Sequence, residues 1–497
     1  MEQIKQIKRS EIVQINEWTY EISDTYRADM RVPARFFASE ALLDDILKDN
    51  ALWQLVNVAT LPGIVGYAYA MPDIHQGYGF PIGGVAAFDI ANGGVISPGG
   101  IGYDINCGVR LLRSNVTRGE IKTRLEELAT ALFGIIPSGV GRGGKLRLQG
   151  ADLDAVLIGG AQQMVALGYG TQDDIIHCEE EGKLAFARPE LVSKQARGRG
   201  ADQLGTLGSG NHFMEIQYVD EIYDTAAAEA FGLRKGLVTI MIHCGSRGLG
   251  HQVCTDYVRA MAHAQKEFGI TLADRELVCA PFTSPVAQEY WGAMGAAANY
   301  AWANRHMIAH WTREAWQNIF GIDVTLETVY DLCHNIGKVE THNYQGTQRS
   351  LIMHRKGATR AFGPTPRHSP ERATAGEFIP AAYRAVGQPV LIPGTMGTAS
   401  YVMAGTSDNM DTAFGSCCHG AGRTLSRTKA REKIHGRTLK HALEAQGIIV
   451  KTDSTVGLAE EAPEVYKDIE AVIACVHGAG LAAKVARLKP LAVIKGG

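Results

Sequence analysis

The chain has 497 residues, of which 45% are hydrophobic and 20% charged, and its net charge at pH 7 is −3. This composition excludes an intrinsically disordered chain and allows a sizeable core. No global excess of positive charge is present, so a polyanionic partner would have to bind a local basic patch. Residues 1–18 lack the apolar segment of a signal peptide, and no stretch approaches about 18 apolar residues. We therefore expect neither a leader nor a membrane span.

Nine cysteines are present, an odd number, and no two of them form a CxxC pair. Such a set does not resemble the disulfide framework of a secreted protein. Reduced thiols and a cytoplasmic location are therefore expected.

Helices and strands alternate along the chain. Residues 121–133 place Ile121, Leu125, Leu128 and Leu132 on one helical face, which predicts an amphipathic helix. Further helices are predicted at 251–267 and 284–319, and short β-rich strands at 237–242, 324–330 and 491–494. This mixture indicates an α+β fold.

The chain shows no linker, and its candidate motifs come from the first, middle and last parts of the sequence. A single domain over residues 1–497 is therefore predicted. Residues 365–377 (TPRHSPERATAGE) lose all periodicity and are expected to be a surface insertion loop.

The glycine-rich segment 98–110 (PGGIGYDINCGVR) places Asp104 and Cys107 three residues apart. A carboxylate and a thiolate on one turn can converge on a metal ion. Taken alone, this spacing is more often a turn aspartate next to a buried cysteine, because free cysteine is one of the most buried residue types. Other parts of the chain favour the metal interpretation.

Three histidines lie where a strand-like run meets small or polar residues: His212, His243 and His334. Each alone is as well explained as a hydrogen-bonded structural histidine. Their similar contexts favour a shared role as ligands. Together with Asp104 and Cys107 they could bind two ions, if the thiolate bridges the ions.

Two glycine-rich segments, 391–406 and 414–427, are suited to binding a nucleotide, because glycine loops direct backbone N–H groups toward phosphates. We expect a helix directly after Gly422 with its N-terminus toward an anion. His419 lies within the second segment, where it could act as a nucleophile. The alternative is the HGxG oxyanion loop of esterases, but the chain has no GxSxG elbow.

Two other nucleotide motifs are incomplete. Residues 139–145 fit GxxxxGK, but Leu146 follows where a P-loop has Ser or Thr. Lys451 begins a sequence similar to the KxDG of lysine-nucleotidylating enzymes, but its last residue is Ser454. A lysine–nucleotide intermediate is therefore not expected.

Basic residues cluster at 194–199, 354–367 and 423–440, and such clusters could neutralise RNA phosphates. Lys433 to Lys440 are better explained as a solvated helix face. Arg423 and Arg427, next to His419, are better candidates for phosphate contacts. Aromatic residues between 290 and 302 are expected to be core residues and not a surface for bases.

Together these segments resemble the RtcB RNA ligase family. The resemblance extends from about Pro72 to the C-terminus and includes SPGGIGYDINCGVRLL, LGTLGSGNHFMEIQ, MIHCGSRGLGHQV, HNIGKVE, HRKGATRAF, PGTMGTASYV, HGAGRTLSR and LKPLAVIKG. It implies one large domain in which helices surround β-sheets around a central metal cleft. It also implies a GTP-dependent ligase of tRNA splicing or RNA repair, which joins a 3′-phosphate or 2′,3′-cyclic phosphate to a 5′-hydroxyl.

The resemblance also assigns the site residues. His419 would form a histidine–GMP intermediate, and two manganese ions would be bound, one by Asp104, Cys107 and His212 and the other by Cys107, His243 and His334. The positions implied for guanylate binding are Asn211, His212, Phe213, Met214, Glu215, His334, Asn335, Pro393, Gly394, Thr395, Met396, Ser400, His419, Gly420, Ala421, Gly422 and Lys495. Arg247 and Arg423 resemble positions suited to RNA phosphate, and an archease-type activating protein is an expected partner.

Three cysteines depart from the family pattern: Cys244, Cys333 and Cys417 stand where Ser, Ala or Thr is usual. A thiolate with three imidazoles would also favour zinc or cobalt over manganese by ligand softness, so manganese comes from the resemblance. Two other functions stay open. A metal-dependent 2′,3′-cyclic phosphodiesterase would not need His419 and its glycine loops, and a catalytically silent RNA-binding protein would not need the intact ligand set.

Overall fold

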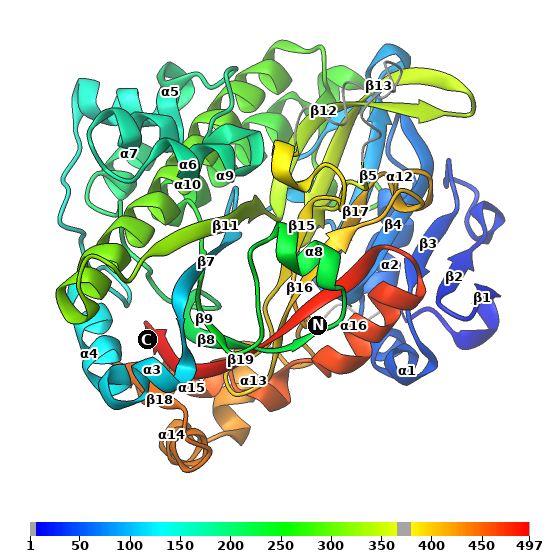
Figure 1. Cartoon of the computed structure of the whole chain (residues 1–497). Coiled ribbons are helices and arrows are strands. Elements are labelled where there is room, and N and C mark those ends of the chain that lie inside the picture. Colours follow the sequence, from blue (N-terminus) through cyan, green and yellow to red (C-terminus); the bar gives the residue numbers. More distant parts are fainter. Residues whose placement is uncertain (1–5, 365–378, 497) are drawn as a thin grey trace.

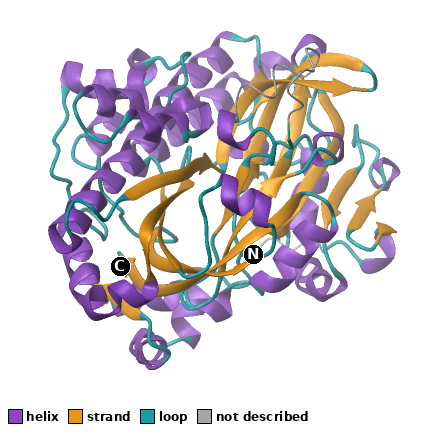
Figure 2. Cartoon of the chain, viewed as in Figure 1, coloured by secondary structure: helices purple, strands orange, loops and turns teal. Residues whose placement is uncertain are grey.

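The computed structural model describes residues 6–364 and 379–496, and it contains two large sheets with helices around them (Figures 1 and 2). The expected mixed α+β fold is confirmed. The predicted insertion loop at 365–377 lies outside the described residues. No helix in the described part of the chain is long and apolar enough to cross a membrane.

The first sheet has seven strands, and all its neighbouring pairs are antiparallel except β3 and β4. In spatial order the strands are β1 (Val13–Asn16), β2 (Thr19–Ile22), β3 (Ala34–Phe37), β4 (Ile64–His75), β5 (Ile82–Asp89), β13 (Thr347–Lys356) and β12 (Asn335–Tyr344).

The second sheet curls strongly, and its outer strands β11 and β15 approach each other, so that it nearly closes into a barrel (Figure 2). Its order is β11 (Leu326–Cys333), β7 (Gly108–Thr117), β9 (Leu237–Cys244), β8 (Phe213–Ile222), β19 (Ala482–Lys495), β16 (Ser400–Gly405) and β15 (Pro389–Ile392), with β18 (Ile449–Thr452) paired parallel to β19. Two short ladders pair β6 (Val95–Ile96) with β10 (Ala280–Pro281), and β14 (Ala358–Arg360) with β17 (Ser416–Cys418).

The long helix α10 (Pro285–Phe320) is buried over most of its circumference. It packs against α4 (Leu125–Ile135), α5 (Gly150–Ala166) and α9 (Arg247–Ala264). A helix that is apolar on all sides is stable only when other elements surround it. Its aromatic residues Tyr300 and Trp302 are fully buried, as expected for core residues.

The other α-helices among the described residues are α1 (Glu40–Lys48), α2 (Ala51–Val58), α3 (Arg118–Ile121), α6 (Gln172–Ile176), α7 (Lys194–Gly200), α8 (Thr225–Ala230), α12 (Asn409–Thr412), α13 (Arg427–Lys433), α14 (Gly436–Ala445), α15 (Thr455–Glu460) and α16 (Ile469–Gly478). The helix expected directly after Gly422 begins only at Arg427. The Ser426 side chain accepts a hydrogen bond from the Lys429 amide and so caps this helix, while the residues before it form a loop.

Helix α10 also supports the end of the second sheet through buried ion pairs. Arg305 contacts Asp331 at 2.8 Å, and both side chains are fully buried. The Arg305 guanidinium also donates to the backbone carbonyls of Asn106, at 2.7 Å, and Cys244, at 2.9 Å. These two residues directly adjoin Cys107 and His243, so the core of the protein anchors two of the predicted metal ligands.

Candidate metal and nucleotide site

The predicted metal ligands meet at one end of the second sheet because the strand register brings them together. Gly108 of β7 pairs with Cys244 of β9 on one side and with Cys333 of β11 on the other. Phe213 of β8 pairs with His243. The residues next to these pairs, Cys107, His334 and His212, are therefore held at the same end of the sheet.

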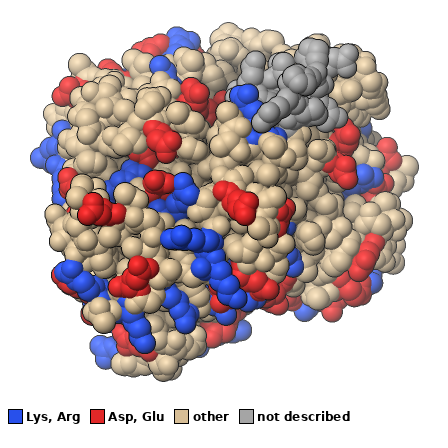
Figure 3. Space-filling view, in the orientation of Figure 1, with Lys and Arg blue, Asp and Glu red and all other residues tan. Residues whose placement is uncertain are grey.

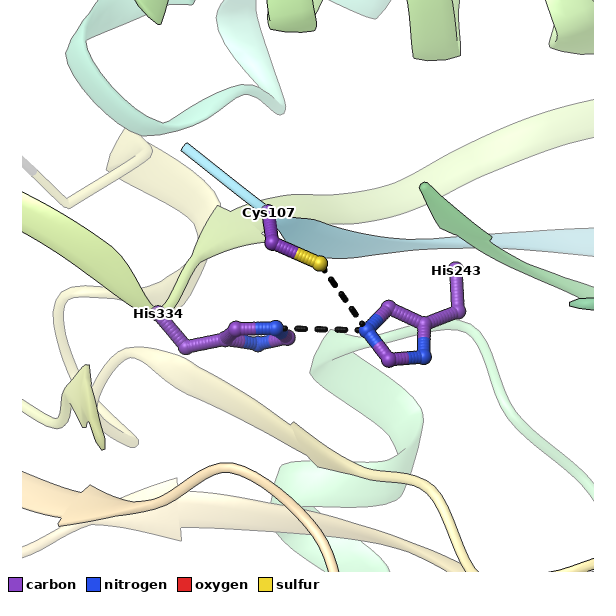
Figure 4. A group of neighbouring side chains, drawn as sticks. All are labelled: Cys107, His243 and His334. Atoms are coloured by element: carbon purple, nitrogen blue, oxygen red, sulfur yellow. Dashed lines mark hydrogen bonds between the residues drawn. The ribbon is translucent and has the colours of Figure 1, made fainter. Parts of the chain in front are cut away.

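The side chains form two groups that share Cys107. In the first, the Sγ of Cys107 lies 3.3 Å from Nε2 of His243, which lies 3.2 Å from Nε2 of His334 (Figure 4). In the second, Sγ lies 3.5 Å from Nε2 of His212, which lies 2.8 Å from Oδ2 of Asp104. Within each group, the candidate ligand atoms are all within 4.8 Å of one another.

The protonation chemistry of His243, His334 and Cys107 fits metal binding. Burial keeps the pKa of both His243 and His334 well below the usual value, so both imidazoles are neutral, as ligands must be. Burial and the nearby Asp104 carboxylate raise the pKa of Cys107 to about 12. A divalent ion would displace the thiol proton. His212 differs from the other two histidines, because Cys244 and Asp104 outweigh the effect of burial and raise its pKa well above the usual value. Leu207 O lies 3.2 Å from its Nδ1, and a bound ion would displace the proton that its Nε2 shares with Asp104.

His419 lies beside this cluster, with its ring 5.0 Å from that of His334. Its Nδ1 is 2.5 Å from Oδ2 of Asp73, and the same oxygen accepts the His419 backbone N–H at 3.1 Å. Because a carboxylate only accepts hydrogen bonds when ionised, Nδ1 carries the proton and Nε2 carries the free lone pair. The histidine is therefore oriented and polarised as a nucleophile requires.

The loop after His419 is fixed against the end of β4, where Asp73 lies. Gly422 has φ +76°, and a Cβ at this position would lie 2.2 Å from the Asp73 carbonyl oxygen, so only glycine fits. The Lys467 backbone N–H donates to the Gly422 carbonyl, and its buried ammonium donates to the carbonyls of Pro72 and Ile74. Lys467 thus connects the loop to the strand.

A cavity of about 390 Å³ connects His419 with the metal cluster. Its size is in the usual range of small-ligand pockets. Asp104, Cys107, His243 and His334 line it, as do these predicted guanylate-binding residues: Asn211, Phe213, Glu215, Asn335, Pro393, Gly394, Thr395, Met396, His419, Gly420, Ala421, Gly422 and Lys495.

Three of the predicted guanylate-binding residues do not line this cavity. His212 belongs to the metal cluster behind it. Met214 is fully buried, because strand alternation turns its side chain away from the face that Phe213 and Glu215 share. Ser400 lies behind the glycine loop and accepts a hydrogen bond from the Gly394 amide at 3.1 Å.

Glu215 and Lys495 bring an acidic and a basic side chain to the cavity wall. Burial raises the pKa of Glu215 to about 7 and lowers that of Lys495. The Lys495 ammonium donates to the carbonyls of Gly210, at 2.7 Å, and His212, at 3.2 Å. It therefore helps to hold the loop that carries Asn211.

The two arginines predicted to contact RNA differ in their surroundings. Arg423 lines the cavity, but its guanidinium already contacts Glu461, Tyr466 and the Glu460 carbonyl. Arg247 is half-buried behind the metal cluster and lies 3.4 Å from Nδ1 of His212.

Sequence reasoning missed several residues that line the cavity: His75, Tyr78, Tyr103, Lys356, Glu461 and Tyr466. It also missed Asp73, which is buried and contacts His419 without lining the cavity. Lys356 belongs to a basic cluster that was noted, yet it is buried, donates to the carbonyls of Tyr78 and Phe80, and has its pKa lowered to about 7 by burial. In the sequence, the DxH spacing of Asp73 and His75 at the end of an apolar run is a weak signal that these two residues belong to a functional site.

The three unusual cysteines are all buried. Cys244 is near the metal cluster, with its Sγ 3.7 Å from Nδ1 of His212. Burial raises its pKa, but His212 and Arg247 outweigh this effect and lower it. Burial raises the pKa of the Cys333 thiol well above its usual value.

Basic side chains are interspersed with acidic ones on the surface and gather around α3, α13 and α15, in the lower left and central part of Figure 3. Helix α13 contributes Arg427, Lys429, Arg431 and Lys433. Arg427 also lines the cavity, so basic residues extend from the surface into the site.

The fold and site define a mixed α+β protein with a buried candidate metal centre beside a carboxylate-bound histidine. A family model described as tRNA-splicing ligase RtcB matches residues 54–496. The tRNA-splicing ligase RtcB of Archaeoglobus fulgidus is 52% identical over 485 residues, which is 97% of this chain and 98% of that protein.

The protein of the same name from Thermococcus kodakarensis is 52% identical over 94% of this chain and 95% of its own length. The RNA-splicing ligase RtcB of Mycobacterium tuberculosis is 51% identical over 89% of this chain and all of its own length. The chain therefore belongs to the RtcB family of RNA ligases.

Proposed function

We propose that this chain is a GTP- and manganese-dependent ligase that joins an RNA 3′-phosphate or 2′,3′-cyclic phosphate to a 5′-hydroxyl. The observation that carries the proposal is the hydrogen bond between His419 Nδ1 and Asp73 beside the shared-cysteine metal cluster. Hydrolysis of a cyclic phosphate would not require this oriented histidine. Ligation through a histidine–nucleotide intermediate would require a histidine that is oriented in this way.

In the first step, Nε2 of His419 attacks the α-phosphorus of GTP, a P–N bond forms, and pyrophosphate leaves. The carboxylate of Asp73 stabilises the positive charge that develops on the imidazole ring. Lys495, Arg427 and the glycine loops line the cavity and could bind the phosphates and the base. Bound divalent ions would neutralise phosphate charge near the reacting atoms.

In the second step, an oxygen of the RNA 3′-phosphate attacks the histidine-bound phosphorus, the P–N bond breaks, and the RNA end now carries an activated GMP anhydride. A 5′-hydroxyl then attacks the RNA phosphate, and GMP leaves as the phosphodiester forms. A cyclic phosphate must first be opened by water to a 3′-phosphate.

This scheme fixes which RNA ends can react. A 3′-hydroxyl cannot accept GMP as an anhydride, and a 5′-phosphate blocks the nucleophile of the last step. Four synthetic combinations of RNA ends should therefore be incubated with the protein, GTP and manganese. Joining only of 3′-phosphate to 5′-hydroxyl is expected, and efficient joining of 3′-hydroxyl to 5′-phosphate would overturn the proposal.

Covalent labelling tests the intermediate. Incubation with α-labelled GTP and manganese should label the protein, ATP should not do so appreciably, and acid should release the label, because a phosphoramidate is acid-labile. The His419→Ala variant should remain folded and unlabelled. Cyclic phosphate opening without any labelling would instead favour the phosphodiesterase.

The expected setting is the cytoplasm, which nine free, buried cysteines support. We propose tRNA halves or broken RNA as substrates and two manganese ions per chain. An archease-type protein is the proposed activator, and its addition should raise the number of ligations per enzyme molecule.

A further inference from the structure

A row of three aromatic rings extends from the wall of the cavity to the surface. Tyr78 and Tyr103 line the cavity, and their ring centroids are 5.5 Å apart at an interplanar angle of 68°. His251, on α9, stacks on Tyr103 with a centroid distance of 4.8 Å and an angle of 29°. The two tyrosines are half-buried and His251 is exposed.

The inner end of the row lies directly beside the reactive centre. Tyr103 precedes Asp104, a candidate metal ligand, in the chain. The Tyr78 carbonyl accepts a hydrogen bond at 2.5 Å from the ammonium of Lys356, which also lines the cavity. A polymer that enters the cavity on this side, with its terminal phosphate at the metal cluster, would pass these rings.

These rings differ from the core aromatics of the protein. Tyr300 and Trp302 of α10 are fully buried, whereas the three rings of the row are partly accessible to solvent. Flat rings at the rim of a nucleic-acid site can stack on bases, and such stacking tolerates any sequence because every base has a π-face. Unpaired RNA ends are the form of RNA whose bases are free to stack in this way.

A cationic side chain lies near the outer end of the row. Arg199 is exposed, and its guanidinium donates to Gln252, the residue after His251, at 3.0 Å. Burial and the charge of Arg199 lower the pKa of His251, so its ring is neutral near pH 7 and suited to stacking. The Glu276 carboxylate, which lies near Tyr78, accepts a hydrogen bond from the Gly79 amide at 2.9 Å.

We propose that Tyr78, Tyr103 and His251 form a stacking surface for the unpaired nucleobases next to the RNA end that enters the cavity. This inference rests on the proposed function and extends it. The substrate class is single-stranded RNA next to the break, and no particular base is selected.

The experiment measures binding of a short single-stranded RNA to the full-length protein by fluorescence anisotropy. The strand carries its dye at the end away from the break, and strands with a 5′-hydroxyl and with a 3′-phosphate are measured separately. A second version of each strand lacks the bases of its terminal nucleotides. Tyr223→Ala is the matched control, because Tyr223 is 41% exposed and does not line the cavity.

His251→Ala should weaken binding of at least one intact strand by roughly 5- to 100-fold, the loss typical of one stacked base. Removing the bases should weaken binding to the wild-type protein similarly, but should cost the His251→Ala variant little more, because the two changes remove the same contact. His251→Phe should restore most of the binding, and Tyr223→Ala should bind like wild type.

The inference is overturned if removal of the bases costs the wild-type protein nothing with either strand. It is equally overturned if His251→Ala weakens intact and base-free strands to the same extent. Neither result depends on GTP or on joining. A wild-type protein that binds RNA through its bases but neither labels with GTP nor joins ends would overturn the proposed function instead.

Discussion

His419 and Asp73, 346 residues apart in the chain, are joined by two hydrogen bonds that converge on one carboxylate oxygen. One bond involves the ring and the other the backbone amide, so the carboxylate sets both the rotation of the imidazole and the position of its loop. The pairing resembles the orienting role of a carboxylate in a catalytic triad.

Asp73→Asn should lower the rate of covalent labelling by GTP by roughly 10²- to 10⁴-fold, because an amide cannot stabilise the charge that develops on the ring. The measurement is the initial rate of label incorporation. Asp89→Asn is the control, since Asp89 pairs with Arg349 at 2.9 Å in the same sheet and does not line the cavity. Normal labelling of the Asp73 variant would contradict the role.

Cys107→Ala should remove both bound ions, whereas His243→Ala should remove one, because the thiolate belongs to both groups of ligands and His243 to one. Metal content per chain, measured by elemental analysis after equilibration with manganese, checks this expectation. Labelling and joining should fall further in the cysteine variant. A count near two that is unchanged in Cys107→Ala would exclude a bridging thiolate.

Arg247 provides a test that separates the joining of RNA from the reaction with GTP. Arg247→Ala should weaken RNA binding or joining more than it weakens labelling, if the side chain contacts RNA phosphate. Gly208→Ala should have a similar effect, because a Cβ on Gly208 would lie 1.8 Å from the Arg247 guanidinium and displace it. Labelling and joining that fall equally in both variants would show that Arg247 acts on the metal site.

Arg423→Ala is predicted to weaken joining more than labelling as well, but its contacts within the protein add a second effect. Its guanidinium contacts Glu461 at 3.1 Å, so its loss leaves a buried carboxylate without this partner. The melting temperature of the variant, measured with its activities, separates the two effects. A variant with wild-type stability and wild-type joining would remove Arg423 from the set of RNA contacts.

A buried ion pair predicts how stability depends on pH. Lys338 lies 2.5 Å from Glu179, and both side chains are buried. Burial opposes ionisation of Glu179, but Lys338 and Arg360 outweigh it and lower its pKa to about 2 from 4.5. Its contribution to the free energy of unfolding is therefore present above about pH 4.5 and is lost as the pH falls toward 2.

Lys338→Met should lower the free energy of unfolding by about 3–5 kcal/mol at pH 7, because a buried carboxylate loses a partner. The raised pKa of Glu179 in this variant should move the acid-sensitive range to higher pH. Denaturant unfolding at several pH values checks both points. Lys489→Met is the control, since this lysine is 46% exposed and its surface pair with Asp220 should contribute at most about 1 kcal/mol.

The sequence by itself determined the local features of this protein. Periodicity located α4, α9 and α10, and apolar runs located parts of β9, β11 and β19. The candidate reactive residues Asp104, Cys107 and His419 lie in glycine-rich turns, which can be recognised from a few consecutive residues. The structure brings these segments together as expected, although their roles in metal and nucleotide binding stay predictions.

Only the tertiary structure decided which distant residues meet. The pairing of Asp73 with His419, the burial of Lys356 and the support of the metal cluster by Arg305 all depend on strand order and register. Hydrophobic periodicity specifies which face of a strand is buried, but it does not specify which strand lies beside it. Helix α13 begins later than expected because contacts of Gly422 with the distant residues Asp73 and Lys467 fix the preceding residues as a loop, and Ser426 then caps the helix.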